Sequence, residues 1–289
     1  MANIKDLKKK IKSTKGTLKI TTAMKLVSAA KLAKAQHSIT NSRPYANELE
    51  DTIRTVSALV RNYNHPYLQQ KKDNNKALLL VISSNKGLCG GYNSQLAKEV
   101  RRYLNETDLD VKVHFIGKKV KELVQTQVNF GKMYEFSKVE PSFAEYKDVV
   151  EELGDLFKAG EFGQVLIAYN VFNSAISFTP TVKKMLPMTL DDSVKQELDK
   201  KHPFDFKYEP DARDILDNLI PQAYLSTAYT CLLDSVAAEH GSRMTSMDNA
   251  KNNCKDVIRE LTLKMNKLRQ AGITTELIEV VSGAESINA

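Results

Sequence analysis

The stretch of this sequence most suggestive of chemistry is a glycine-rich turn around a lone cysteine. In LLLVISSNKGLCGGYNS, residues 78–94, an apolar run reaches the turn and a helix-compatible stretch follows it. A phosphate-binding P-loop needs a lysine and a hydroxyl residue directly after its glycines, and the dinucleotide fingerprint needs a different glycine spacing. A structural turn is therefore the favoured interpretation, with phosphate binding and a nucleophilic thiol as the two alternatives. The residues concerned are Gly87, Cys89, Gly90 and Gly91.

The other residue types that carry chemistry are scattered along the chain. The five histidines and three cysteines show no spacing typical of a metal site. No pair of carboxylates stands out as an acid–base couple. We therefore predict no cofactor, no metal and no catalytic residue. The cysteines are odd in number and widely separated, which is typical of a reduced cytosolic protein. No apolar run is long enough for a membrane helix or a secretory signal.

Positive charge is concentrated at the N-terminus. Residues 1–34 contain ten lysines, no arginine and one acid, which gives +9; the whole chain carries +7, so the remainder sums to −2. Five of these lysines are spaced by three and four residues and therefore share one helix face. A solvated face, an acidic protein partner and nucleic acid are the three interpretations, and the absence of arginine and aromatic residues before Arg43 disfavours nucleic acid. The stripe consists of Lys5, Lys8, Lys12, Lys15 and Lys19.

Both ends of the chain predict long helices. None of the eight prolines falls in 1–43 or 222–289, so both stretches lack the strongest helix breaker. Near the N-terminus, large residues recur every seven positions from Ile4, and mostly smaller residues recur every seven positions from Leu7. The two series together form a heptad seam. A second apolar stripe lies on another face, so we expect this helix to have more than one neighbour. That stripe consists of Ile20, Met24, Val27 and Ala30.

The C-terminal stretch has a clearer heptad repeat. Between 244 and 268 its two seam positions are filled mainly by methionine, isoleucine and leucine. Pro221 is suited to the first turn of a helix. From there to about Val281 the helix would have roughly 60 residues and a length of ~90 Å. Such a helix exceeds the width of an ordinary domain, so we expect much of it to contact other subunits or water.

The middle of the chain has a different period. Short β-rich runs alternate there with helical patterns, which predicts a mainly parallel sheet with helices on its faces. Ala175–Leu186 could add an edge strand, interrupted at Pro180. The predicted strands are 76–83, 111–116 and 165–172, and the predicted helices are about 93–105, 118–126 and 142–159.

The predicted fold is therefore of the α/β class. An antiparallel coiled coil of long N- and C-terminal helices carries an inserted small Rossmann-like α/β domain. The predicted boundaries are 1–60 for the N-terminal helix, 61–210 for the inserted domain and 211–289 for the C-terminal helix.

Four blocks of the sequence resemble the gamma subunits of F-type ATP synthases, in order and along essentially the whole chain. They are IKSTKGTLKITTAMKLVSAAKLAKAQ, ISSNKGLCGGYN, AAEHGSRMTSMDNAKNN and ITTELIEVVSGAES. The last is similar to the family's C-terminal signature. Two departures are visible: Asn85 stands where the family usually has an aspartate, and Gly241 is slightly unusual within its block.

The resemblance implies a central rotor shaft that performs no bond chemistry itself. In this family the paired terminal helices lie inside a ring of alternating alpha and beta subunits. The α/β domain forms a foot that docks on the membrane ring of c subunits together with the epsilon subunit. Rotation of the shaft couples that ring to ATP synthesis or hydrolysis by alpha and beta. The implied location is the cytoplasmic face of the bacterial plasma membrane, without direct insertion and without nucleic acid.

The resemblance also implies partner-contact residues. Met24 and Lys25, with Arg243 and Met244 of the Arg-Met block, are similar to the positions where the shaft meets an acidic segment of beta. Near the end of the chain, a second set is similar to the upper shaft's contacts with the ring: Arg269, Gln270, Thr274 and Glu276. Two other functions stay open from the residues alone. One is a coiled-coil scaffold that binds nucleic acid through the lysine stripe; the other is a small-molecule enzyme built on the middle domain.

Overall fold

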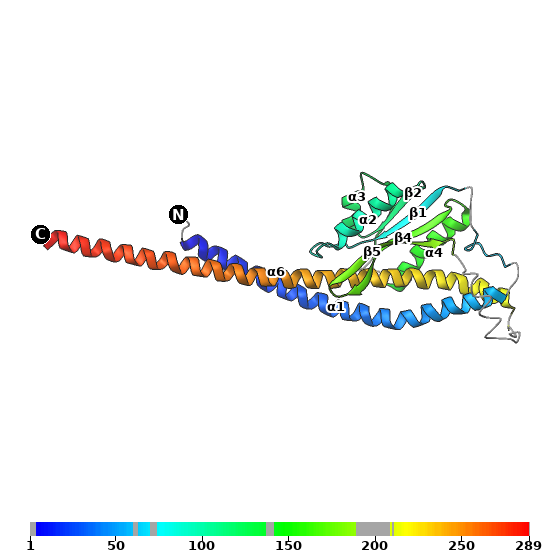
Figure 1. The fold of residues 1–289 in the computed structure, drawn as a ribbon, viewed down its shortest axis with the longest axis horizontal. Coiled ribbons are helices and arrows are strands. Elements are labelled where there is room, and N and C mark those ends of the chain that lie inside the picture. The colour runs from blue at the N-terminus through cyan, green and yellow to red at the C-terminus, as the bar shows by residue number, and fades with distance from the viewer. Residues whose placement is uncertain are drawn as a thin grey trace. The chain divides into compact units, whose positions relative to one another are not determined.

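The computed structural model describes residues 4–59, 63–69, 74–136, 142–188, 209 and 211–288. Two long helices, α1 and α6, form the two ends of the chain, and a five-stranded sheet with three shorter helices lies between them in sequence (Figure 1). The chain divides into two compact units, one comprising 1–28 and 243–289 and the other comprising 29–242. The elements are α1 (Ile4–Leu59), β1 (Lys76–Ile82), α2 (Tyr92–Glu106), β2 (Asp110–Ile116), α3 (Lys118–Val124), β3 (Asn129–Tyr134), α4 (Phe143–Ala159), β4 (Gln164–Ser174), β5 (Ser177–Leu186) and α6 (Ala212–Asn288).

The sheet of the larger unit has the strand order β3-β2-β1-β4-β5. The first four strands along the chain run parallel, and β5 returns antiparallel to β4 as a hairpin. β1 lies at the centre, and every one of its residues after Lys76 is buried. A strand buried on both faces reads as a continuous apolar run, which explains the sequence KALLLVI. The predicted α/β fold with flanking long helices is confirmed.

Helices cover both faces of this sheet. On one face, α2 and α3 enclose a core that includes Leu79, Leu96 and Val120. On the other face, α4 and the N-terminal part of α6 pack against alternate residues of the same strands, for example Leu80, Leu153 and Leu216. Because successive side chains of a strand point to opposite faces, one apolar run supplies both cores.

Local sequence signals explain where α4 begins and ends. The Ser142 side chain accepts a hydrogen bond from the Glu145 backbone N–H, and the Glu145 carboxylate accepts one from the Ser142 N–H, which completes a capping box. Gly160, at φ 84°, ends the helix in the left-handed conformation that glycine adopts at little cost.

Two strands differ from the expectations. β3 was not predicted, because NFGKMY at the sheet edge has only one fully buried residue and no clean alternation. The edge strand β5 runs uninterrupted through Pro180, which is paired with Asn170 of β4. An edge strand tolerates proline because one side of it needs no ladder hydrogen bonds.

Both long helices contain an internal proline. α1 continues past Pro44, and α6 begins nine residues before Pro221, at Ala212. The prediction that Pro221 lies in the first turn of its helix is therefore wrong. Packing of Leu216 and Ile220, both fully buried, holds the preceding turns in place and outweighs the lost backbone hydrogen bond. The predicted three-part division at 60/61 and 210/211 stays a prediction.

The heptad seams match the burial of the long helices. In the smaller unit, Leu7 and Thr21 of α1 are buried, and the seam positions of α6 from 247 to 268 are buried or half-buried, whereas most of the residues between them are exposed. The second stripe of α1 behaves differently, since Ile20 and Val27 are 62% and 58% exposed. No helix among the described residues is both long and apolar enough to span a membrane.

A buried histidine in the sheet makes the stability of the protein depend on pH. His114 of β2 is 5% exposed, and its Nδ1 lies 3.1 Å from the Tyr134 hydroxyl. Burial lowers the pKa of His114 to about 4, and nearby Glu152 opposes that shift only partly. The unfolded chain, with an ordinary histidine pKa, binds a proton at higher pH than the folded protein does.

We therefore expect the free energy of unfolding to fall as the pH falls from 6.5 towards 4, by up to about 3 kcal/mol from this residue. Urea denaturation at a series of pH values measures the slope. Other acids titrate in the same range, so the comparison is between the wild type and His114→Asn. Equal slopes for the two proteins would contradict this assignment.

Candidate functional site

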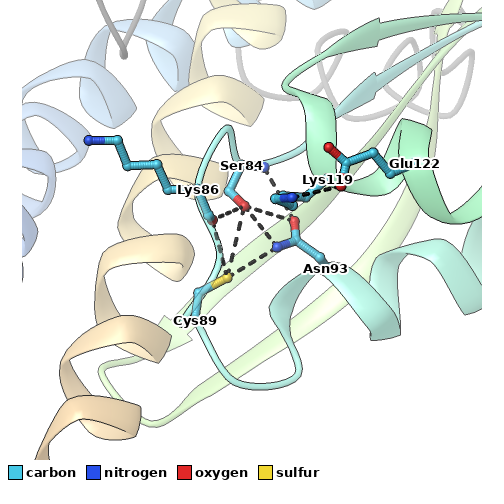
Figure 2. Close-up of polar contacts among 6 residues, drawn as sticks. All are labelled: Ser84, Lys86, Cys89, Asn93, Lys119 and Glu122. Atoms are coloured by element: carbon cyan, nitrogen blue, oxygen red, sulfur yellow. Dashed lines mark hydrogen bonds and ion pairs between the residues drawn. The ribbon is translucent and has the colours of Figure 1, made fainter.

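The glycine-rich turn lies at the carboxyl end of the central strand and leads into α2. Its polar groups are turned towards one another (Figure 2): Ser84 Oγ donates to the Lys86 carbonyl at 2.8 Å, and the Asn93 amide nitrogen donates to Ser84 Oγ at 2.8 Å and to Cys89 Sγ at 3.1 Å. Cys89 is 2% exposed. Asn93, at the start of α2, therefore links Ser84, just after β1, to Cys89 in the middle of the turn.

The backbone of this turn is unusual at two positions. Leu88 has φ 62° and Gly90 has φ 54°. The left-handed region costs glycine little but costs other residues about 1–2 kcal/mol. The Leu88 side chain is nevertheless 62% exposed, so burial of that side chain does not offset the cost. The neighbouring polar contacts and the burial of Cys89 hold the conformation.

The turn also lies at the topological switch point of the sheet, where the connecting helices change from one face of the sheet to the other. β1 is paired with β2 on one side and β4 on the other, and the helices that follow β1 and β3 cover opposite faces. In open α/β sheets, ligands bind in the crevice at the carboxyl ends of two such strands. The sequence alternatives of phosphate binding and nucleophilic catalysis both concern this crevice.

In this protein α6 occupies that crevice. Ser242 Oγ donates to the Cys89 carbonyl at 2.5 Å, and the Tyr92 hydroxyl lies 2.6 Å from Ser235 Oγ and donates to the Ser235 carbonyl at 3.1 Å. Ser235 Oγ also donates to the Ile82 carbonyl at the end of β1. Burial raises the pKa of the Tyr92 phenol, which therefore stays neutral and donates.

A small apolar cluster completes the contact between the turn and α6. Ala238 of α6 packs against Cys89 and Tyr92, and the rings of Phe172 and Phe178 cover them from the β4–β5 hairpin. Tyr92, Ser235 and Ser242 were not among the predicted site residues. Their types are ordinary on a helix, and contacts across 143 and 153 residues leave no local pattern.

The thiols differ in accessibility, which leads to a labelling prediction. Cys89 and Cys231 are 2% and 1% exposed, whereas Cys254 is half-buried on α6. Burial raises the pKa of Cys231 to about 11. With a maleimide reagent on the purified native chain, we expect the Cys254 thiol to react at least ~100-fold faster than the other two thiols. Cys254→Ala should remove this fast phase of the reaction. Fast modification of Cys89 would instead favour a reactive thiol in the turn.

The predicted lysine stripe is exposed along α1. All five of its lysines fall in the exposed class: Lys5, Lys8, Lys12, Lys15 and Lys19. Its role as a contact surface stays a prediction.

The predicted contact residues nearer the middle of the helices form a charged cluster in the smaller unit. Lys25 Nζ lies 2.7 Å from Asp248 Oδ1, and Lys251 Nζ lies 3.7 Å from the same oxygen. The hydrogen bond from Lys25 lowers the pKa of Asp248 below its ordinary value. Arg243 is 7% exposed, and Met24 and Met244 are half-buried. Asp248 was absent from the predicted set.

The contact residues predicted near the end of α6 are all exposed. Thr274 Oγ1 donates to the Gln270 carbonyl one turn earlier, and the side chains of Arg269 and Glu276 are open to solvent. Large apolar side chains are exposed in the same stretch. They are Ile273, Leu277, Ile278, Val280 and Val281, each between 49% and 69% exposed.

Fold and site together define a class of protein built for contacts between subunits. Helices of 56 and 77 residues from the two chain ends flank a sheet whose ligand crevice is occupied by one of them. The ATP synthase family model matches residues 3–287.

The relatives are gamma chains. The ATP synthase gamma chain of Trichlorobacter lovleyi is 35% identical over 290 residues and that of Bdellovibrio bacteriovorus is 39% identical over 295, with 99% of each chain covered in both cases. The chain therefore belongs to the gamma-chain family of F-type ATP synthases.

Solved structures show the same fold. A chain of the Tetrahymena thermophila mitochondrial ATP synthase central stalk and c-ring structure is 25% identical, with a TM-score of 0.56, and the match covers 80% of this chain and 99% of that one. A chain of the Euglena gracilis mitochondrial ATP synthase has a TM-score of 0.68 at 18% identity, with 98% and 94% covered. None of these names refers to nucleic acid.

Proposed function

We propose that this chain is the central-stalk rotor subunit of a proton-translocating F-type ATP synthase. It couples rotation of the membrane ring to ATP synthesis or hydrolysis at the alpha and beta subunits and performs no bond chemistry itself. Its partners are alpha, beta, epsilon and the ring of c subunits, at the cytoplasmic face of a bacterial plasma membrane. The family membership supports this proposal, as do the names of the relatives.

The observation that carries the proposal is the distribution of exposed apolar side chains. In α1, Ile20 and Val27 lie on a face separate from the buried seam, and in α6 the stretch 273–281 exposes apolar residues. Exposed apolar surface of this extent is typical of surfaces that other proteins cover. A shaft enclosed by a ring of subunits needs apolar contact without strong, direction-specific attachment.

The test is ATPase activity of purified alpha and beta subunits, with and without this chain, and with the chain alone as a blank. We expect a silent blank and strong turnover of the mixture, saturating at a fixed ratio of this chain to the alpha–beta pairs. A mixture that the chain leaves unchanged would contradict the proposal. Hydrolysis by the chain alone would favour the enzyme alternative and direct attention to the turn at 87–91.

Coupling is tested through the central charged residues. In the reconstituted complex we expect Lys25→Gln with Arg243→Gln to lower ATP synthesis by about threefold or more, because these cations are proposed to contact an acidic segment of beta. ATP-synthesis rates in proteoliposomes measure the effect, and immunoblotting measures how much chain is assembled.

The matched control removes two exposed cations of α6 outside the predicted contact set, Lys255→Gln with Arg259→Gln. Equal synthesis in both double variants, at equal assembly, would remove Lys25 and Arg243 from the proposed interface.

A further inference from the structure

We propose that the crevice at the carboxyl ends of β1 and β4 is a socket that holds α6 at one rotational setting. Tyr92, Ser235 and Ser242 are its positioning residues, and through them torque passes between the α/β sheet and α6. The inference rests on the proposed rotor function. It assigns to the switch point of this sheet a mechanical role in place of ligand binding.

The two serine contacts lie beyond the part of α6 that packs on the sheet. Residues of α6 from Leu216 to Leu232 contribute to the apolar core of the sheet, whereas Ser235 contacts the carbonyl at the end of β1 and Ser242 contacts the Cys89 carbonyl in the turn that follows it. Ser242 is also the last residue of the larger unit before α6 continues into the smaller one. The socket therefore holds the helix where it leaves the unit that contains the sheet.

The contacts between α6 and the turn are also directional, because they are hydrogen bonds. Apolar burial is non-directional, so a helix packed only through an apolar face resists removal better than it resists rotation about its own axis. Hydrogen bonds weaken steeply when the donor angle is lost. The contacts of Ser235 and Ser242 with Tyr92 and Cys89 span the interface at two points seven residues apart, two turns along one face of α6.

The socket itself is held rigidly by hydrogen bonds to the strands around it. The Ser83 N–H donates to the Ile116 carbonyl at 2.7 Å, and the Lys119 N–H donates to the Ser84 carbonyl at 3.1 Å, so β1 and β2 are joined behind the turn. The Asn170 amide donates to the Tyr92 carbonyl from β4. The receiving side of the socket is thus tied to three strands or their ends.

A close approach of the β4–β5 hairpin completes the socket. A Cβ atom at Gly241 of α6 would lie 3.0 Å from the carbonyl oxygen of Ala175, one of the two residues between β4 and β5. Glycine inside a helix costs stability relative to alanine. At this position it lets the hairpin lie directly on the helix between the two serine contacts.

The experiment removes the two serine hydroxyls in the reconstituted complex. In the absence of a proton gradient, we expect the double variant Ser235→Ala with Ser242→Ala to have an ATPase activity within about twofold of that of the wild type. We expect protons pumped per ATP hydrolysed, against a rising gradient, to fall by about fivefold because the helix slips in its socket. Ser226→Ala, a serine of the same helix outside the socket, is the control and should pump like the wild type. Ser235→Thr with Ser242→Thr, which keeps both hydroxyls, should restore pumping.

A second readout is independent of coupling. Backbone amide exchange of residues 84–92 in the purified chain should be at least ~10-fold faster in the double alanine variant than in the wild type. A wild-type chain that fails to activate alpha and beta would overturn the rotor function. The amide-exchange comparison would then still test the socket by itself. Wild-type coupling together with unchanged pumping in the double variant would overturn the socket. If the double variant does not fold, Ser242→Ala alone decides the outcome in the same way, because Ser242 is only half-buried.

Discussion

Replacing Gly117 by alanine is expected to lower the free energy of unfolding by about 3 kcal/mol. Gly117 joins β2 to α3 at φ 88°, a conformation that an alanine adopts only with strain. A Cβ atom there would also overlap the backbone carbonyl of Ser83, at the end of the neighbouring strand β1. Both costs fall on backbone atoms, so no side chain can rotate to relieve them.

Urea denaturation of the purified chain, followed by circular dichroism, measures this loss. Gly87→Ala is the matched control: that glycine lies in the turn after β1, without positive φ, and a Cβ atom there meets nothing within 4 Å. We expect the control to change stability by less than about 0.5 kcal/mol. A Gly117→Ala protein as stable as the control would mean that the ends of β1 and β2 are less tightly joined than the structure indicates.

Removing the charge of Arg43 is expected to have the second-largest effect, a loss of about 2 kcal/mol for Arg43→Met. Arg43 of α1 lies 3.2 Å from Asp234 of α6, whose side chain is only 7% exposed. Without the guanidinium, the Asp234 carboxylate stays buried, and Lys183 is the remaining cation that attracts it electrostatically. The loss is smaller than for a fully buried pair because the Arg43 side chain is half-exposed.

A double variant separates the ion pair from the packing. Arg43→Met with Asp234→Leu removes both charges, so we expect most of the lost stability to return. Burial raises the pKa of Asp234, and Arg43 opposes that rise. Protonation of Asp234 at acid pH relieves the stranded charge in Arg43→Met, so the difference from the wild type should shrink as the pH falls. A difference that is constant with pH, or a double variant as unstable as the single, would show that Arg43 acts through its hydrocarbon stem.

Periodic patterns allowed much of the fold to be predicted from the sequence. The heptad seams fix which faces of α1 and α6 are buried, and the apolar runs of β1 and β4 predict buried parallel strands, because burial on both faces demands continuous apolarity. β3 escaped prediction because an edge strand with mixed exposure has no clear period. The prediction that Pro221 lies in the first turn of its helix is wrong because proline locally favours a helix beginning, whereas the buried side chains before it are held by tertiary packing.

The turn at 87–91 shows the limit of sequence reasoning most clearly. Its glycine spacing disfavours a phosphate loop, and this follows from residue types alone. What occupies the crevice beside it depends on Ser235 and Ser242, about 150 residues away, which are ordinary helix residues until the fold brings them to the turn.

The sequence by itself therefore determined the helical ends, the α/β middle, the basic N-terminal stripe and the family, because each depends on periodic patterns or motifs that are read along the chain. Only the tertiary structure decided that Lys25 is paired with Asp248, that Arg43 holds a buried carboxylate, and that α6 fills the switch point of the sheet. These contacts join residues far apart in sequence. They depend on distances and burial that no local period encodes.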